Sequence, residues 1–180
     1  MVGLVKVDWR LAKAERLFSS LSDKRMAQAL STGVNKTARG TMTFAAGLVA
    51  KEMGARRKDT KKSFRIYPYS KPDTLSATVR GRGKRLPLMT FKARRGKKGA
   101  SAAAWGKRKT YAGTFIATMA SGHAGVFKRD GKSRFPISEL WGPGVASTME
   151  QEAVESVIVD QGRDRLLANV EYQIARYMRR

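Results

Sequence analysis

The side chains that could perform catalysis are few in this chain. It contains no cysteine and one histidine, His123, so thiol catalysis, disulfides and a metal site of Cys or paired His are excluded within one subunit. Asp73 and the pair Asp130 and Lys132 imitate, by residue type alone, the carboxylates and lysine of a metal-dependent nuclease. Asp130 precedes Gly131, however, and this dipeptide is typical of a hairpin turn. We therefore expect no catalytic residue, no metal and no cofactor.

Basic side chains dominate the middle of the sequence. The chain has 37 Lys and Arg against 14 Asp and Glu, a formal net charge of +23. Residues 74–129 hold 14 of the basic residues and no acidic one. A regional excess of this kind indicates binding to nucleic acid or to an acidic protein surface. Because the sequence has no visible recognition helix or zinc motif, contact with DNA would be to its backbone.

Residues 93–109 are the densest part of this basic region. A run of small residues at 99–104 separates two basic clusters, a pattern typical of a long exposed loop or a protruding hairpin. We call residues 93–109 the basic loop. We predict that its electrostatic contacts are made by Arg94, Arg95, Lys97, Lys98, Lys107, Arg108 and Lys109.

Three further residues have structural interpretations. His123, within SGHAG, is predicted to support a tight turn between two strands. Trp105 is interpreted as a buried anchor at the base of the basic loop, with stacking on a nucleic-acid base as the alternative. Trp141 is expected in the core or in a subunit contact.

The spacing of apolar residues indicates helices at both ends of a strand-rich middle. It predicts one long helix over residues 23–53 and another over 145–180, with Gly162 bending or dividing the second. Alternating polarity predicts strands at 64–69, 74–80, 86–92, 114–119, 125–129 and 134–137. The fold class is thus α+β: an antiparallel β-sheet or small β-sandwich or barrel flanked by a long N-terminal and a long C-terminal helix, with a protruding basic loop or hairpin.

The organisation of the chain is expected to be simple. A length of 180 residues suits a single domain, 1–180, in which residues 1–21 form an N-terminal arm or short helix. The longest apolar run, 44–50, is far shorter than the ~20 residues that cross a membrane. We therefore expect a soluble protein that is not exported and does not bind a membrane.

Two phrases of the sequence are long and specific: GTFIATMASGHAGVF at 113–127 and RFPISELWGPGV at 134–145. Together with VNKTA at 34–38, RLPLMTF at 85–91 and a C-terminal segment that is first acidic and then basic, they resemble the minor tail protein Z family of lambda-like tailed phages. The resemblance covers residues 22–180, and residues 1–20 match nothing in it.

The resemblance implies a structural virion protein, not an enzyme, that completes the head-proximal end of the tail at the neck and supports head-tail joining. It implies a homo-oligomeric ring, expected to be a hexamer, that is assembled in the host cytoplasm and retained in the virion. The implied partners are the tail terminator, the tail tube, head-completion proteins and packaged double-stranded DNA. Two alternatives stay open: a sequence-independent nucleic-acid-binding protein and, less favoured, a metal-dependent nuclease.

Overall fold

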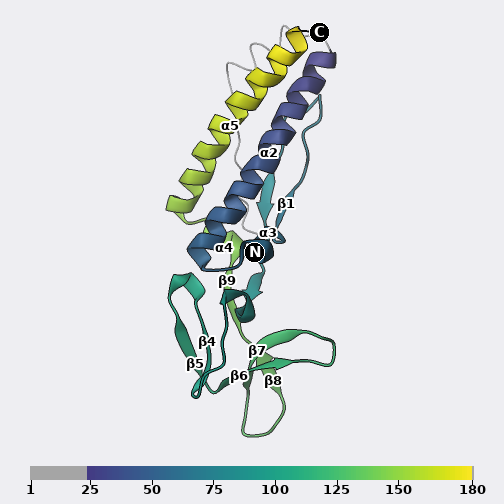
Figure 1. The fold of residues 1–180 in the computed structure, drawn as a ribbon. Coiled ribbons are helices and arrows are strands. Elements are labelled where there is room, and N and C mark those ends of the chain that lie inside the picture. The colour runs from purple at the N-terminus through teal and green to yellow at the C-terminus, as the bar shows by residue number, and fades with distance from the viewer. Residues whose placement is uncertain (1–23, 180) are drawn as a thin grey trace.

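The molecule is elongated. The structure is a computed structural model that describes residues 24–179. Two long antiparallel helices, α2 (Lys24–Met53) and α5 (Glu152–Met178), form a stalk, and most of the strands lie beyond one end of it (Figure 1). The predicted α+β class is confirmed, with four small antiparallel sheets and no closed barrel in the described part of the chain. The predicted arm or helix of residues 1–21 lies outside the described residues.

The long first helix was correctly predicted, because its apolar spacing persists over many turns. Met26, Leu30, Ala45 and Val49 are all buried. Helix α2 is followed by Gly54, which has a φ of +70°. A Cβ atom there would lie 2.5 Å from the carbonyl oxygen of Ala103, so only glycine fits where the helix ends against the basic loop.

Small and polar residues line the contact between α2 and α5. A Cβ atom on Gly33 would lie 3.3 Å from the carbonyl oxygen of Asn169, and the Asn169 side-chain amide donates to the Thr37 hydroxyl at 3.0 Å. Gly162 is buried inside the unbroken helix α5. The prediction that Gly162 divides this helix is therefore wrong, and a bend there stays a prediction. The break lies at residues 150–151, after the short helix α4 (Val145–Met149).

The segment after α2 returns along the stalk. Helix α3 (Arg57–Lys61) leads to strand β1 (Phe64–Ile66), which pairs antiparallel with β2 (Val79–Gly81). Residues 67–78 run beside α2, where the Asn35 side chain donates to the Ser70 carbonyl oxygen at 2.9 Å and accepts from the Ser70 N–H at 2.8 Å. The hairpin was expected, but its strands are shorter than predicted, because Pro68 has no N–H to give to the ladder and the backbone of Ser70 bonds to Asn35 instead.

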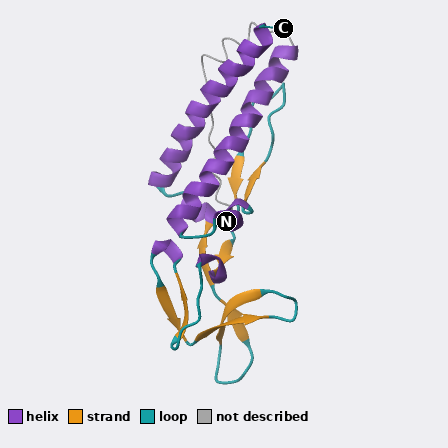
Figure 2. Cartoon of the chain, in the orientation of Figure 1, coloured by secondary structure: helices purple, strands orange, loops and turns teal. Residues whose placement is uncertain are grey.

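The remaining strands form three small sheets (Figure 2). β3 (Arg85–Pro87) pairs with β9 (Trp141–Gly144), and β4 (Gly99–Ala102) pairs with β5 (Lys109–Ala112). β6 (Thr114–Thr118), β7 (Ala124–Arg129) and β8 (Ile137–Glu139) form the third sheet. Short 3-10 helices occupy Leu88–Phe91 (η1) and Ala104–Gly106 (η2), so the strand predicted for 86–92 ends at Pro87.

Two predictions near β8 need correction. The predicted strand at 134–137 begins only at Ile137, because Pro136 has no N–H to give to a ladder. The connection from β7 is therefore the longer loop 130–136 and not a tight Asp130-Gly131 hairpin turn. In this loop Asp130 accepts a hydrogen bond from the Ser138 hydroxyl at 2.7 Å.

The core lies where the stalk meets the strands. Its fully buried side chains come from α2, η1, β7 and α4, segments distant in the sequence: Val49, Met53, Leu88, Phe91, Val126, Val145 and Thr148. Gly142 packs so closely on the Phe91 ring that a Cβ atom there would enter it. This core fixes the base of the stalk to the strands that carry the basic residues.

Candidate interaction site

The cations gather in the part of the molecule beyond the end of the stalk. We call residues 92–129, which include β4 to β7, the basic lobe (Figure 2). The basic lobe holds ten Lys and Arg and no Asp or Glu. None of these ten cations has an ion pair within residues 24–179. The lobe therefore presents uncompensated positive charge to whatever it contacts.

The hairpin β4–β5 positions most of the predicted contact residues. Its small-residue run is not simply exposed, because Ala100 and Ala102 are each only 1% exposed and belong to the core. Gly99 has a φ of +139°, and a Cβ atom there would collide with the carbonyl oxygen of Tyr111. Small side chains thus let this hairpin pack tightly while its charged residues stay outside.

The seven predicted contact residues flank the strands of this hairpin. Arg94 pairs through its backbone with Ser101, which adds a third strand-like segment. Lys109 opposes Ala102 at the other end of the pairing. All seven side chains are exposed, at both ends of the hairpin: Arg94, Arg95, Lys97, Lys98, Lys107, Arg108 and Lys109.

Two of these seven residues also stabilise the lobe. The Arg108 guanidinium donates to the Ser101 hydroxyl and to the Lys92 carbonyl oxygen, both at 3.1 Å. The Arg95 guanidinium donates to the Ile116 carbonyl oxygen at 3.1 Å. Four of the seven are lysines whose side chains make no hydrogen bond or ion pair with any described residue: Lys97, Lys98, Lys107 and Lys109. The lysines are therefore free to bind a partner without loss of fold.

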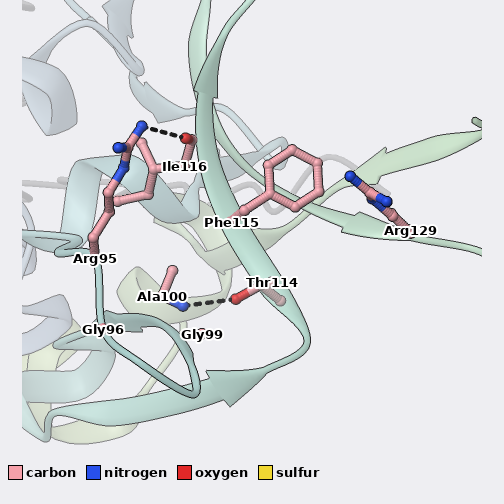
Figure 3. A pocket seen from close by; sticks show the side chains of 8 residues that line it. All are labelled: Arg95, Gly96, Gly99, Ala100, Thr114, Phe115, Ile116 and Arg129. Atoms are coloured by element: carbon pink, nitrogen blue, oxygen red, sulfur yellow. Dashed lines mark hydrogen bonds between the residues drawn. The ribbon is translucent and has the colours of Figure 1, made fainter. Parts of the chain in front are cut away.

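A pocket lies between the start of the hairpin and strand β6. It encloses about 450 Å³, and its lining includes Arg95, Thr114, Phe115 and Arg129 and no acidic residue. In Figure 3 the two arginines lie on opposite sides of β6. Arg129 sits over the Phe115 ring, 5.6 Å from its centroid. Each guanidinium separately suits a carboxylate or phosphate, which Arg clamps with paired N–H groups.

Arg129 was not among the predicted contact residues. It is the last residue of β7 and reaches this pocket because the β6–β7 pairing places Lys128 opposite Thr114. The register between two strands decides which cation joins the pocket, and single-sequence patterns do not fix that register. The only sequence signal is that Arg129 ends the acid-free stretch.

His123 lies in the turn between β6 and β7, where its carbonyl oxygen accepts from the Met119 N–H at 2.8 Å. Its Nε2 atom is 2.9 Å from Oε1 of Glu139 on β8, so the side chain ties the turn to the third strand. A Cβ atom on Gly125 would lie 2.8 Å from both Glu139 and Phe127. These contacts give the SGHAG phrase a structural explanation.

The two tryptophans are partly exposed. Trp105 is 46% exposed and has a φ of +59°, so the prediction of a buried anchor is wrong within one subunit. The small residues of β4, not Trp105, anchor the hairpin. Trp141 is 42% exposed on β9, and the Lys84 ammonium lies 5.6 Å from its ring centroid. Both remain candidates for subunit contacts.

The nuclease-like residues do not assemble in the described part of the chain. No group of three or more His, Asp or Glu side chains there is placed to hold a metal ion. No helix within residues 24–179 is long and apolar enough to cross a membrane.

Comparison with known proteins gives one family match. No curated protein and no solved structure matches the chain. The family model described as prophage minor tail protein Z matches residues 10–180. The match begins before residue 22, so residues 10–20, which were predicted to match nothing, are part of it. The chain therefore belongs to the prophage minor tail protein Z family and is a phage tail protein of the virion.

Proposed function

We propose that this chain is the subunit of a ring that completes the head-proximal end of a phage tail and supports its joining to the head. It acts by shape and charge complementarity and not by catalysis. Membership of a phage tail family supports this role. The observation that carries it is the separation of a helical stalk from a basic lobe whose ten cations have no ion pair among the described residues.

The two parts of the molecule suit two kinds of contact. Unpaired like charges repel, so the basic lobe is stabilised when an anionic surface approaches it. The stalk exposes long helix surfaces that one core does not need, and head-to-tail contacts between such surfaces form a ring when the rotation between neighbours closes. A six-fold ring would match the symmetry expected of a tail tube.

The proposed partners of the basic lobe are acidic faces of the tail terminator, the tail tube and head-completion proteins, and packaged double-stranded DNA. The pocket arginines Arg95 and Arg129 suit carboxylates and phosphates alike. The exposed lysines suit phosphates as compact point charges. The ring would assemble in the host cytoplasm and remain at the neck of the virion.

The test replaces the four lysines without structural contacts by glutamine: Lys97, Lys98, Lys107 and Lys109. We expect tails to form but joining to filled heads to fall, because the docking charge is lost while the hairpin is intact. Head-tail joining is measured as the ratio of complete particles to free tails by electron microscopy. The matched control replaces four exposed lysines on α2 and α3: Lys24, Lys51, Lys58 and Lys61. Normal joining by the first variant would refute the assigned contact set.

A second candidate function is sequence-independent nucleic-acid binding outside the tail, favoured by the absence of any acid in the basic lobe. It requires that the isolated protein bind short duplex DNA tightly, with a steep loss of affinity as salt rises. Failure of the isolated protein to bind such DNA at low salt would eliminate this candidate.

A further inference from the structure

We infer that neighbouring copies of this chain contact each other through two opposite faces of the stalk. One face is acidic and apolar and lies on α5. The other is basic and aromatic and lies on residues 65–71. This inference rests on the proposed ring, and it names the surfaces that hold the ring together.

Helix α5 carries a stripe that faces away from α2. The contact with α2 uses buried residues such as Ile158 and Leu166. The stripe follows the alternating three-and-four spacing of helices that pack along a seam. Apart from the half-buried Ile174 its members are exposed, and we call them the acidic stripe: Val157, Asp160, Asp164, Leu167, Glu171, Ile174 and Met178.

The acidic stripe lacks partners for its charged and apolar groups. Asp164 and Glu171 have no ion pair in the described residues, and Asp160 has only an exposed contact with Arg163 at 3.9 Å. Met178 is 74% exposed. An exposed row of apolar and unpaired acidic side chains indicates a surface that contacts a cationic, partly apolar partner.

The opposite face of the stalk has that character. Phe64, Ile66 and Ser70 are buried, whereas the odd-numbered residues and Pro68, which lies at a bend, are exposed. Two more cations stack on the outward tyrosines: Arg80 lies 5.6 Å from the Tyr67 ring centroid and Arg39 lies 5.8 Å from that of Tyr69. We call the outward residues the basic face: Arg65, Tyr67, Tyr69 and Lys71.

The acidic stripe and the basic face point in opposite directions. On α2, Gly33 contacts α5 while Asn35 contacts Ser70 of the returning segment. Residues two apart lie about 200° apart around a helix of 3.6 residues per turn. Figure 1 shows α5 and β1 on either side of α2. One copy can therefore use its acidic stripe on one neighbour and its basic face on the other.

The two surfaces match in length and in charge. Asp160 to Glu171 spans about 16 Å of helix, and Arg65 to Lys71 can span at most about 20 Å. Tyrosines are enriched in protein interfaces, where they would cover the apolar members of the stripe. A two-fold contact would set acids against acids, which is repulsive, so the contact is head-to-tail, the kind that builds a ring when the rotation between neighbours closes.

The experiment reverses charge on each surface in the phage and measures the copies of this chain in purified tails. One variant carries Asp164→Lys with Glu171→Lys, and the other carries Arg65→Glu with Lys71→Glu. Each variant expressed alone should be absent from purified tails, because every contact between neighbouring copies becomes repulsive. All four changes in one chain should restore incorporation. Co-expression of the two variants should also restore it, because each variant can contact only the other. The two then alternate around the ring, which must have an even number of subunits.

The matched control for net charge is Glu52→Lys with Glu150→Lys, at exposed positions outside both surfaces; it should be incorporated normally. Normal incorporation of the single-surface variants, or no restoration by combining them, would overturn this interface while leaving the ring proposal intact. Absence of the unmodified chain from tails, or its presence as one copy, would overturn the proposed function itself.

Discussion

Replacement of Asn35 by alanine should release the segment that carries the basic face. Asn35 exchanges two hydrogen bonds with the backbone of Ser70, which is only 6% exposed. The Ser31 hydroxyl also donates to the Ser70 carbonyl oxygen, at 2.9 Å. In the variant the carbonyl oxygen therefore keeps a partner, but the buried Ser70 N–H loses the one that Asn35 supplies.

The magnitude follows from these contacts. Leaving a buried N–H without a partner costs about 1–3 kcal/mol, and the second lost bond adds about 1 kcal/mol. Alanine returns up to about 0.7 kcal/mol through its higher helix propensity. We expect the free energy of unfolding to fall by about 2 kcal/mol. Ser31→Ala should cost about 1 kcal/mol, because Asn35 still satisfies the Ser70 carbonyl oxygen.

The assay is urea unfolding followed by circular dichroism, where a loss of this size lowers the midpoint by about 1 M. Thr32→Ala is the control, since the Thr32 hydroxyl is exposed and bonds only to its own helix. Hydrogen exchange of residues 67–78 should quicken in the Asn35 variant. A midpoint no lower than that of Ser31→Ala, or unchanged exchange in residues 67–78, would refute the assigned role of Asn35.

Three further outcomes are expected. Gly142→Ala should destabilise the protein by about 1–3 kcal/mol in thermal unfolding, because the new methyl group enters the Phe91 ring, whereas Gly131→Ala, with open space around it, should change little. Phe91→Ala should cost about 3–5 kcal/mol and Phe135→Ala, at a residue 64% exposed, less than about 0.5 kcal/mol in urea unfolding; equal losses would contradict the assigned core. If the isolated protein binds DNA through the lobe lysines, neutralising Lys97, Lys98, Lys107 and Lys109 should lower the log-log salt slope of affinity by roughly 3 to 4; an unchanged slope would place DNA elsewhere.

The helices could be predicted because their patterns are long and redundant. Apolar spacing persists over the 30 residues of α2, so no single residue decides the prediction. Strands β6 and β7 were also placed nearly correctly, because the phrase between 114 and 129 alternates around a glycine-rich turn. The α+β class follows from these elements alone.

What could not be predicted depends on contacts between distant segments. Glycine weakens an isolated helix, but here Gly162 lies buried in α5. Ala100 and Ala102 give no strong apolar signal, yet they anchor the hairpin in place of Trp105. Asn35 bonds to Ser70, which lies 35 positions away in the sequence, and no local pattern predicts such a pair.

The candidate site was predicted by charge and not by geometry. The sequence located the cations. It could not distinguish Arg95 and Arg108, whose guanidinium groups donate hydrogen bonds within the lobe, from the lysines, whose side chains make no such bond. It also missed Arg129, whose place at the pocket depends on strand pairing. Composition therefore identifies the basic region, whereas the tertiary structure shows which of its cations stabilise the lobe and which lie at the pocket.

The most direct measurement of the central claim is a cryo-electron microscopy reconstruction of complete particles that carry this chain. We expect a closed ring of identical copies at the junction of tail and head. In that ring the α5 stripe of each copy should face residues 65–71 of the next, and the basic lobes should face acidic protein or DNA. A single copy, or a location at the distal tip of the tail, would contradict it.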